Sequence, residues 1–271
     1  MGRTPPISVL RQLRQEVGFG CPVDGCGNPY LEFHHFDPPY HLEQHHRPEG
    51  MIALCAEHHK KADNGAFTND QLAALKRRSA DPTLVRGRFD WMRNEIVAYM
   101  GGCLYHETYR LITVDGQDVV WLSRDADGYL LLNVRMLSLL PEHRVVITEN
   151  LWENIGKPTE LVSPPNGRKL SVAYANGDSL DVEFYEVQSV EEAAKSFALV
   201  PEQYLARLKF PVTAVQLGVS VGGTNFRLEP GGTFIGGSTF RGGLISRCGT
   251  GFAVNTGIPW AQLEPERDTD A

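Results

Sequence analysis

The chain has 271 residues, of which 42% are hydrophobic and 22% charged, and its formal net charge is −7. This composition is typical of an ordinary globular protein, and the length permits either one large domain or two smaller ones. No apolar run approaches the ~20 residues that cross a bilayer, and the N-terminus carries no signal-peptide pattern, so we expect a cytoplasmic protein with no membrane partner. The acidic balance also argues against a protein that coats nucleic acid by bulk charge, although residues 1–80 carry equal numbers of basic and acidic side chains.

Short elements and polar loops alternate in the first third of the chain. Ile7, Leu10, Leu13 and Val17 recur at helical spacing and predict a short amphipathic helix over residues 7–17. The further elements expected here are a turn-rich loop at 21–29, a strand at 30–36, a helix from Met51 to about Gly65, and a helix from Gln71 to Arg78 capped at Thr68–Asp70.

The pattern changes after residue 80. Asp81-Pro82 predicts a hinge, and apolar residues at helical spacing between Phe89 and Met100 predict a linker helix over residues 84–100. The chain beyond this helix has the short alternating segments of a β-rich fold. We therefore expect an α+β protein with a compact N-terminal domain at 1–80, a linker at 81–102 and a β-rich domain at 103–271.

Turn signals predict the hairpins of the β-rich part. Asp115-Gly116 and Asn176-Gly177 each separate two apolar segments, as in β-hairpins. The segments predicted as strands are 107–114, 117–124, 129–137, 143–148, 169–175 and 180–187, and one helix is predicted near 190–199.

Glycine doublets mark the last part of the chain, at 222–223, 231–232, 236–237 and 242–243. Their spacing is unequal, so they do not form a strict repeat. They favour tight turns between short stacked strands, as in a partial β-solenoid, and the alternative is a small sandwich with glycine turns. The acidic tail, 264–271, is predicted to fray.

Cysteine and histidine gather in the N-terminal third. Cys21 and Cys26 lie on the turn-rich loop, and Cys55 and His58 lie close together near the start of a helix. Two close pairs on separate elements are typical of a tetrahedral structural zinc site in a reducing compartment. His59 is the adjacent alternative to His58 as the fourth ligand.

A second group of ligand-type residues follows the same strand and helix. His34 and His35 end the predicted strand, while His59 and Asp63 are one helical turn apart and share a helix face. A histidine at a strand end opposite an imidazole and a carboxylate can hold a divalent cation and leave positions open for water and phosphate. Mg²⁺ is the expected ion. Consecutive strand residues point to opposite faces, so His34 and His35 share a site only where the strand end twists or bulges.

The two segments 31–36 and 51–63 together resemble the motif of the HNH endonuclease family, in its zinc-containing branch. The resemblance covers about residues 7–80. It implies that His34 is the first ligand of the catalytic metal and His35 the general base, and that His59 and Asp63 are the helix ligands. His58 stands where many members have the fourth zinc cysteine.

One position departs from the family. The central asparagine that helps to orient the general base would fall at Gly50. His46 is the favoured substitute in the adjoining loop, and Glu49 is the other candidate. If neither takes this role, the domain is expected to bind metal with little or no cleavage.

The resemblance implies metal-dependent hydrolysis of phosphodiester bonds in DNA, with RNA as the alternative substrate, structural Zn²⁺ and catalytic Mg²⁺ or Mn²⁺. The alternative function is a zinc-stapled nucleic-acid-binding module without catalysis, fused to a β-rich interaction domain. The expected contacts to the nucleic-acid backbone are the basic residues Lys60, Lys61, Lys76, Arg77 and Arg78.

Overall fold

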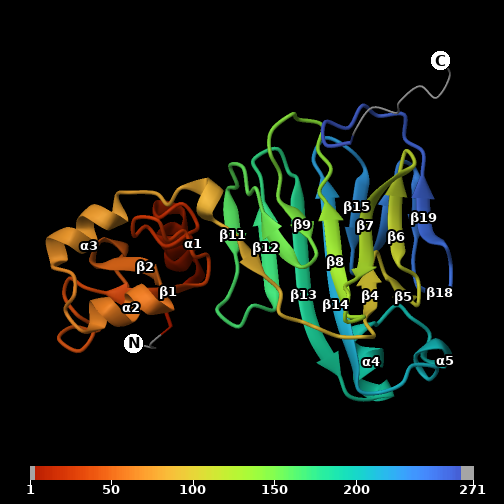
Figure 1. Ribbon diagram of the computed structural model, residues 1–271, viewed down its shortest axis with the longest axis horizontal. Coiled ribbons are helices and arrows are strands. Elements are labelled where there is room, and N and C mark those ends of the chain that lie inside the picture. Colours follow the sequence, from red (N-terminus) through yellow and green to blue (C-terminus); the bar gives the residue numbers. More distant parts are fainter. Residues whose placement is uncertain (1–3, 264–271) are drawn as a thin grey trace.

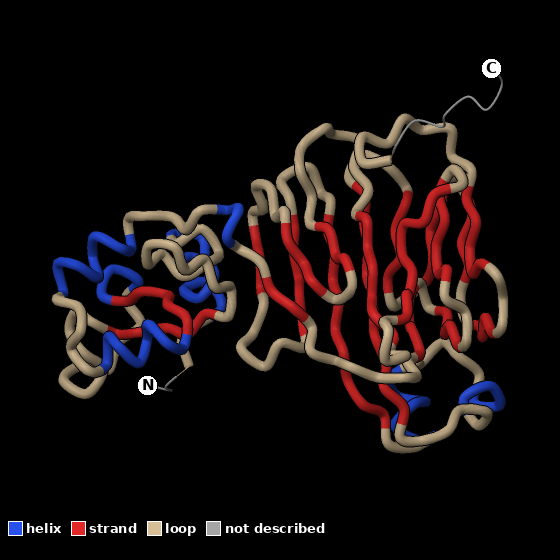
Figure 2. The backbone as a smooth tube through the Cα atoms, in the orientation of Figure 1, coloured by secondary structure: helices blue, strands red, loops and turns tan. Residues whose placement is uncertain are grey.

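The computed structural model describes residues 4–263, and the acidic tail at 264–271 lies outside these described residues. A small helical unit lies beside the edge of a large β-structure (Figure 1). The α+β class is therefore confirmed, with most of the regular structure in strands (Figure 2). Within the described residues, no helix combines the length and the apolar character that a membrane span requires.

The N-terminal unit is built on a two-stranded antiparallel sheet. The strands pair from Leu31 opposite Cys55 to His35 opposite Met51. The helices cover a small core that contains Leu13, Ile52 and Leu54. The elements are α1 (Ile7–Glu16), β1 (Leu31–His35), η1 (Pro48–Gly50), β2 (Met51–Cys55), α2 (Ala56–Asp63) and α3 (Asn69–Lys76).

Three predicted elements of this unit are confirmed, and one boundary is wrong. The helix at 7–17, the strand at 30–36 and the helix capped at Thr68 are present, and Thr68 forms a capping box with Gln71. The helix predicted from Met51 begins only after Cys55, because Met51–Cys55 is fully buried as strand β2. A short continuous apolar run fits a buried strand and a buried helix equally well, and pairing with β1 decides for the strand.

The predicted linker helix at 84–100 is wrong. This segment contains a short turn, η2 (Pro82–Leu84), then β3 (Gly87–Arg88) and β4 (Val97–Met100). The strand β4 pairs with β14 on one side and with β5 on the other. Ala98 and Met100 belong to one core cluster, whereas Val97 and Tyr99 belong to another. Because both faces of β4 are buried, all four of its residues are apolar and show no strand alternation, so the helical spacing between Phe89 and Met100 was the only pattern in the sequence.

Two sheets make up the β-rich part and share one core, to which Val120 and Leu132 of one sheet and Val182 and Leu217 of the other contribute. One sheet has the order β19-β6-β7-β8-β9-β10-β3. The other runs β11-β12-β13-β14-β15-β16-β17, with β4, β5 and β18 branching from β14. The elements not yet given are β5 (Cys103–His106), β6 (Arg110–Val114), β7 (Gln117–Arg124), β8 (Leu130–Arg135), β9 (Val146–Thr148), β10 (Leu151–Glu153), β11 (Glu160–Val162), β12 (Lys169–Ala173), β13 (Ser179–Val187), α4 (Val190–Ser196), α5 (Glu202–Leu205), β14 (Val212–Val221), β15 (Phe226–Glu229), β16 (Gly232–Ile235), β17 (Ser238–Phe240), β18 (Gly243–Ser246) and β19 (Thr250–Val254).

The hairpins predicted at Asp115-Gly116 and at Asn176-Gly177 are confirmed as β6–β7 and β12–β13, and the helix near 190–199 is confirmed as α4. The β-solenoid prediction is wrong. Three of the glycine doublets lie in or beside turns between antiparallel neighbours from β14 to β17, which is the arrangement of the sandwich alternative. A solenoid would instead stack its strands in parallel.

Helix α1 joins the two parts of the molecule. The guanidinium group of Arg14 pairs with the Glu160 carboxylate at 2.7 Å, and Arg11 pairs with the same carboxylate. The side-chain amide of Gln15 donates to the backbone oxygen of Thr159 at 2.8 Å. These contacts attach the N-terminal unit to the edge strand β11 (Figure 1).

Candidate metal centres and general base

Three cysteines and one histidine converge on one point of the N-terminal unit. The ligand atoms of Cys21, Cys26, Cys55 and His58 all lie within 4.8 Å of one another. The Sγ atoms of Cys26 and Cys55 are 3.8 Å apart, and His58 Nδ1 lies 3.4 Å from the Cys21 Sγ and 3.2 Å from the Cys55 Sγ. A tetrahedral set of thiolates and an imidazole bonded at about 2.0–2.3 Å has edges of about 3.3–3.8 Å. These four residues could therefore hold a metal ion such as zinc.

Local sequence explains how the loop brings Cys21 and Cys26 together. The Cys26 amide donates to the Val23 carbonyl, and the Gly27 amide donates to the Cys21 carbonyl, so the chain turns tightly between the two thiols. Gly25 and Gly27 have positive φ, which glycine adopts at no steric cost. Burial raises the pKa of the Cys21 thiol. A bound cation would reverse this effect because it stabilises the thiolate.

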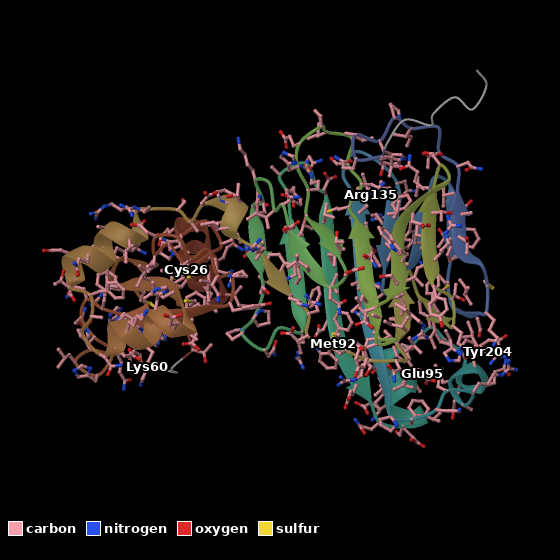
Figure 3. All side chains as sticks on the ribbon, in the orientation of Figure 1. Cys26, Lys60, Met92, Glu95, Arg135 and Tyr204 are labelled. Atoms are coloured by element: carbon pink, nitrogen blue, oxygen red, sulfur yellow. The ribbon has the colours of Figure 1, made fainter. Side chains whose placement is uncertain are left out.

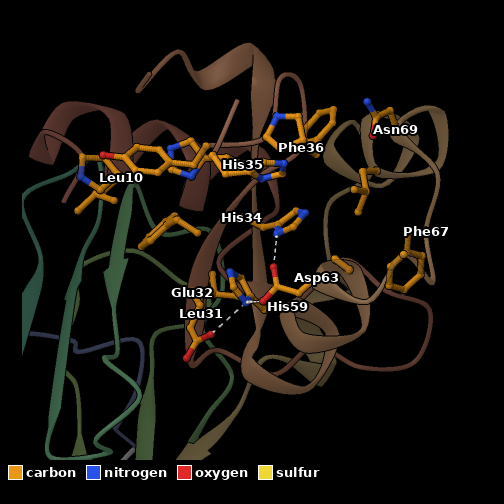
Figure 4. A pocket seen from close by; sticks show the side chains of 18 of the residues that line it. Leu10, Leu31, Glu32, His34, His35, Phe36, His59, Asp63, Phe67 and Asn69 are labelled. Atoms are coloured by element: carbon orange, nitrogen blue, oxygen red, sulfur yellow. Dashed lines mark ion pairs between the residues drawn. The ribbon is translucent and has the colours of Figure 1, made fainter. Parts of the chain in front are cut away.

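The second group lies on β1 and α2 (Figure 4). The ligand atoms of His34, His59 and Asp63 lie within 4.8 Å of one another. The Asp63 carboxylate lies between the two imidazoles, with one oxygen 3.2 Å from His34 Nδ1 and the other 3.4 Å from His59 Nδ1. Burial lowers the pKa of His34, which favours the neutral, ligating form of the imidazole. Two imidazoles and a carboxylate are a suitable donor set for a divalent ion with open positions.

His35 is held by the loop between β1 and β2. Its Nε2 lies 2.9 Å from the backbone oxygen of His45. A carbonyl oxygen accepts only, so Nε2 carries the proton and Nδ1 keeps a free lone pair in the neutral ring. Burial also lowers the pKa of His35, which keeps the ring neutral. A neutral imidazole with one unprotonated nitrogen can act as a general base, and here that nitrogen is Nδ1.

Sequence analysis missed His45. Its ring is buried, with Nε2 2.9 Å from the Pro38 oxygen and Nδ1 accepting from the Arg47 amide at 3.1 Å. The imidazole thus anchors the loop from within and fixes the position of the carbonyl that contacts His35. The spacing of histidines in this loop gave no signal for this role, because the contact to His35 comes from the backbone.

The HNH resemblance implies an asparagine that orients the general base, and this chain has none at Gly50. In this structure the backbone carbonyl of His45 contacts the His35 ring instead. The His46 ring lies 5.8 Å from the His35 ring and stacks on Tyr40, and Glu49 is exposed. A catalytic role of His46 stays a prediction. At Gly50 a side chain has no room, because an added Cβ would lie 1.9 Å from the backbone oxygen of Asp37.

Gly50→Asn, which introduces the asparagine that the HNH resemblance implies at this position, is therefore expected to lower activity instead of raising it. The clash forces the backbone at Asp37 and the neighbouring His45 ring to move, and overpacking of this kind costs about 1–3 kcal/mol. Thermal unfolding and any metal-dependent activity would be measured together. Gly237→Asn is the matched control, because an added Cβ there meets no heavy atom within 4 Å. A Gly50→Asn protein as stable as the wild type and more active would contradict this account.

One cavity of about 820 Å³ unites the second group with His35. The pleat of β1 sends the imidazoles of His34 and His35 in different directions, toward α2 and toward the loop respectively (Figure 4). Both rings nevertheless line the cavity, together with His59 and Asp63. The structure thus brings His34, His59 and Asp63 together, while His35 lines the same cavity with its ring directed toward the loop; its convergence with them on one cation stays a prediction.

The basic residues expected at a nucleic-acid interface have varied surroundings. Lys76 is ion-paired with Glu16 and largely buried, Lys61 pairs with Glu57, and Arg78 pairs with Asp24. Such pairs reduce the charge available to a phosphate. The side chains of Lys60 and Arg77 are exposed, and Lys60 lies at the surface of the N-terminal unit (Figure 3). Contacts to nucleic acid by these five residues stay a prediction.

No family model, curated protein or solved structure matches this chain.

Proposed function

We propose that this protein is a metal-dependent endonuclease that hydrolyses phosphodiester bonds in DNA. One observation carries the proposal: His34, His59 and Asp63 converge at the cavity that His35 also lines, and the His45 carbonyl leaves Nδ1 of a neutral His35 unprotonated. The resemblance of segments 31–36 and 51–63 to the HNH motif assigns the same roles to these residues. Geometry and motif therefore support one mechanism.

The Cys21, Cys26, Cys55 and His58 group is proposed to hold zinc as a structural ion. Three thiolates and one imidazole occupy all four tetrahedral positions, so no position remains for substrate. The group lies at the junction of the loop with β2 and α2, and α2 also carries His59 and Asp63. Zinc at this point would fix the helix that presents the ligands of the second ion.

The proposed mechanism uses each residue of the cavity for one task. His34, His59 and Asp63 would hold Mg²⁺ or Mn²⁺, which supplies charge stabilisation for the phosphoryl oxygens and the leaving 3′ oxygen. His35 accepts a proton from the attacking water through Nδ1, while the His45 carbonyl keeps the proton on Nε2. Cleavage of this kind involves no base-specific group, so the sequence preference of the protein would come from residues outside the cavity.

The test uses the full chain loaded with zinc and a supercoiled plasmid. We expect nicked and linear products when Mn²⁺ or Mg²⁺ is added, and no products from the same zinc-loaded protein without it. A zinc-loaded, folded protein that leaves the plasmid intact at saturating Mn²⁺ would contradict the proposal. Retarded migration of DNA without cleavage would then favour the alternative, a zinc-stapled nucleic-acid-binding module, for which the absence of a side chain at Gly50 is the supporting observation. RNA substrate in a parallel reaction identifies the preferred nucleic acid, and a cytoplasmic location stays a prediction.

A further inference from the structure

Glu32 is a second carboxylate at the His34–His59–Asp63 group. It lies on β1 two residues before His34, so both side chains leave the same face of the strand. Glu32 Oε2 lies 3.5 Å from His59 Nδ1, and the contact is visible as a dashed line at the base of the cavity (Figure 4). The side chain lines the same cavity as the three ligand-type residues.

The nitrogen that Glu32 contacts decides between two roles for this carboxylate. A carboxylate that only orients a ligating imidazole contacts the ring nitrogen remote from the metal. Here Glu32 and Asp63 approach the same atom, His59 Nδ1, at 3.5 and 3.4 Å. His34 also faces Asp63 through Nδ1. The Nδ1 atoms thus mark the metal side of the group, and Glu32 lies on this side.

The distance between Glu32 and His59 also fits direct ligation, whereas Glu32 lies outside the set whose ligand atoms are all within 4.8 Å of one another, so ligation requires its carboxylate to move toward the other ligands. Adjacent ligands bonded at about 2.1 Å to one ion are about 3.0 Å apart in octahedral and about 3.4 Å apart in tetrahedral geometry. Glu32 contacts His59 at nearly the same distance as Asp63 does. The Glu32 side chain is 41% exposed and so has room to rotate about its side-chain bonds. Such a rotation can bring the carboxylate toward His34 as well.

We propose that Glu32 is a fourth protein ligand of the ion in the cavity, beside His34, His59 and Asp63. The inference rests on the ion site of the proposed function and deepens it. Two carboxylates neutralise a divalent cation, whereas Asp63 alone leaves one positive charge. Two imidazoles and two carboxylates form a neutral complex with a divalent ion and retain the ion without substrate, and the nitrogen donors favour Mn²⁺ over Mg²⁺.

Mn²⁺ binding to the zinc-loaded full chain tests this proposal without relying on activity. Free Mn²⁺ is measured by electron paramagnetic resonance in titrations of the wild type, Glu32→Gln, Glu32→Ala and His59→Ala. We expect both Glu32 variants to lose more than about 100-fold in Mn²⁺ affinity, above the roughly 10–100-fold effect of a partner that only supports a ligand. Asp70→Asn removes an exposed carboxylate of the same unit, outside the cavity, and is expected to keep wild-type affinity.

Two controls separate ligation from other effects. The titrations are repeated at high salt, because a bulk charge effect is screened there and a direct metal–ligand bond is not. Circular dichroism and zinc content show that each variant is folded. A loss of about 100-fold or less in Glu32→Gln, or a loss that disappears at high salt, would overturn the role of Glu32 as a ligand and leave the endonuclease proposal intact. A wild type that binds no Mn²⁺ would overturn the ion site itself, and with it both proposals.

Discussion

His35→Ala is expected to lower the rate of Mn²⁺-dependent plasmid nicking by about 10²–10⁴-fold, which is the usual contribution of a general base. The His35 side chain donates from Nε2 to the His45 carbonyl, and its Nδ1 is the atom available to take a proton from water. Alanine removes the base and keeps the backbone of β1. The ligand group of His34, His59 and Asp63 should therefore remain, and Mn²⁺ should still bind.

The comparison needs three measurements on each protein: nicking rate, Mn²⁺ affinity and zinc content. His143→Ala is the matched control, because His143 is an exposed histidine of the β-rich part. We expect this variant to cleave like the wild type. Equal nicking by wild type and His35→Ala, prepared in the same way, would show that another group acts as the base or that a contaminant cleaves the plasmid. Loss of Mn²⁺ binding in His35→Ala would instead show that His35 is a ligand.

Cys21→Ser is expected to release zinc and unfold the N-terminal unit, not to leave a folded and inactive protein. Cys21 is fully buried and is one of the four ligand-type residues of this group. Structural zinc sites contribute apparent free energies of about 10–16 kcal/mol to the folding of small domains. The net free energy of unfolding of a domain is small, so loss of this contribution is expected to unfold the unit. The loop at 21–29 is irregular and glycine-rich, so metal ligation is its expected source of stability.

Zinc content per chain and the far-ultraviolet circular dichroism of the helices are the measurements for this variant. Cys248→Ser is its control, since Cys248 is exposed and lies in the β-rich part, and it should keep both signals. The β-sandwich core takes only Phe19 and Ala80 from the first 80 residues, so its thermal transition should survive in Cys21→Ser. A zinc-free Cys21→Ser protein with wild-type helix content would contradict the structural role of the metal.

Local chemistry in the sequence was enough for the turns, the caps and both candidate metal groups. Asp115-Gly116 and Asn176-Gly177 form hairpin turns because their preferred backbone angles are those that such turns need. Thr68 caps α3 through groups only three residues away. Each metal group combines residues that are close in sequence, such as His59 and Asp63, with one or two from a neighbouring element. Short-range preferences of this kind need no knowledge of the remaining chain.

Only the tertiary structure decided where an apolar run becomes a strand and which group holds the general base. The segments Met51–Cys55 and Val97–Met100 lie within predicted helices and become strands, because pairing with β1 and with β14 outweighs weak local propensity. The His45 carbonyl, the lack of room at Gly50 and the approach of Glu32 to His59 follow from the path of the backbone, to which side-chain patterns give no access. Side-chain chemistry identifies the candidate ligands, and long-range packing sets the geometry in which they could act.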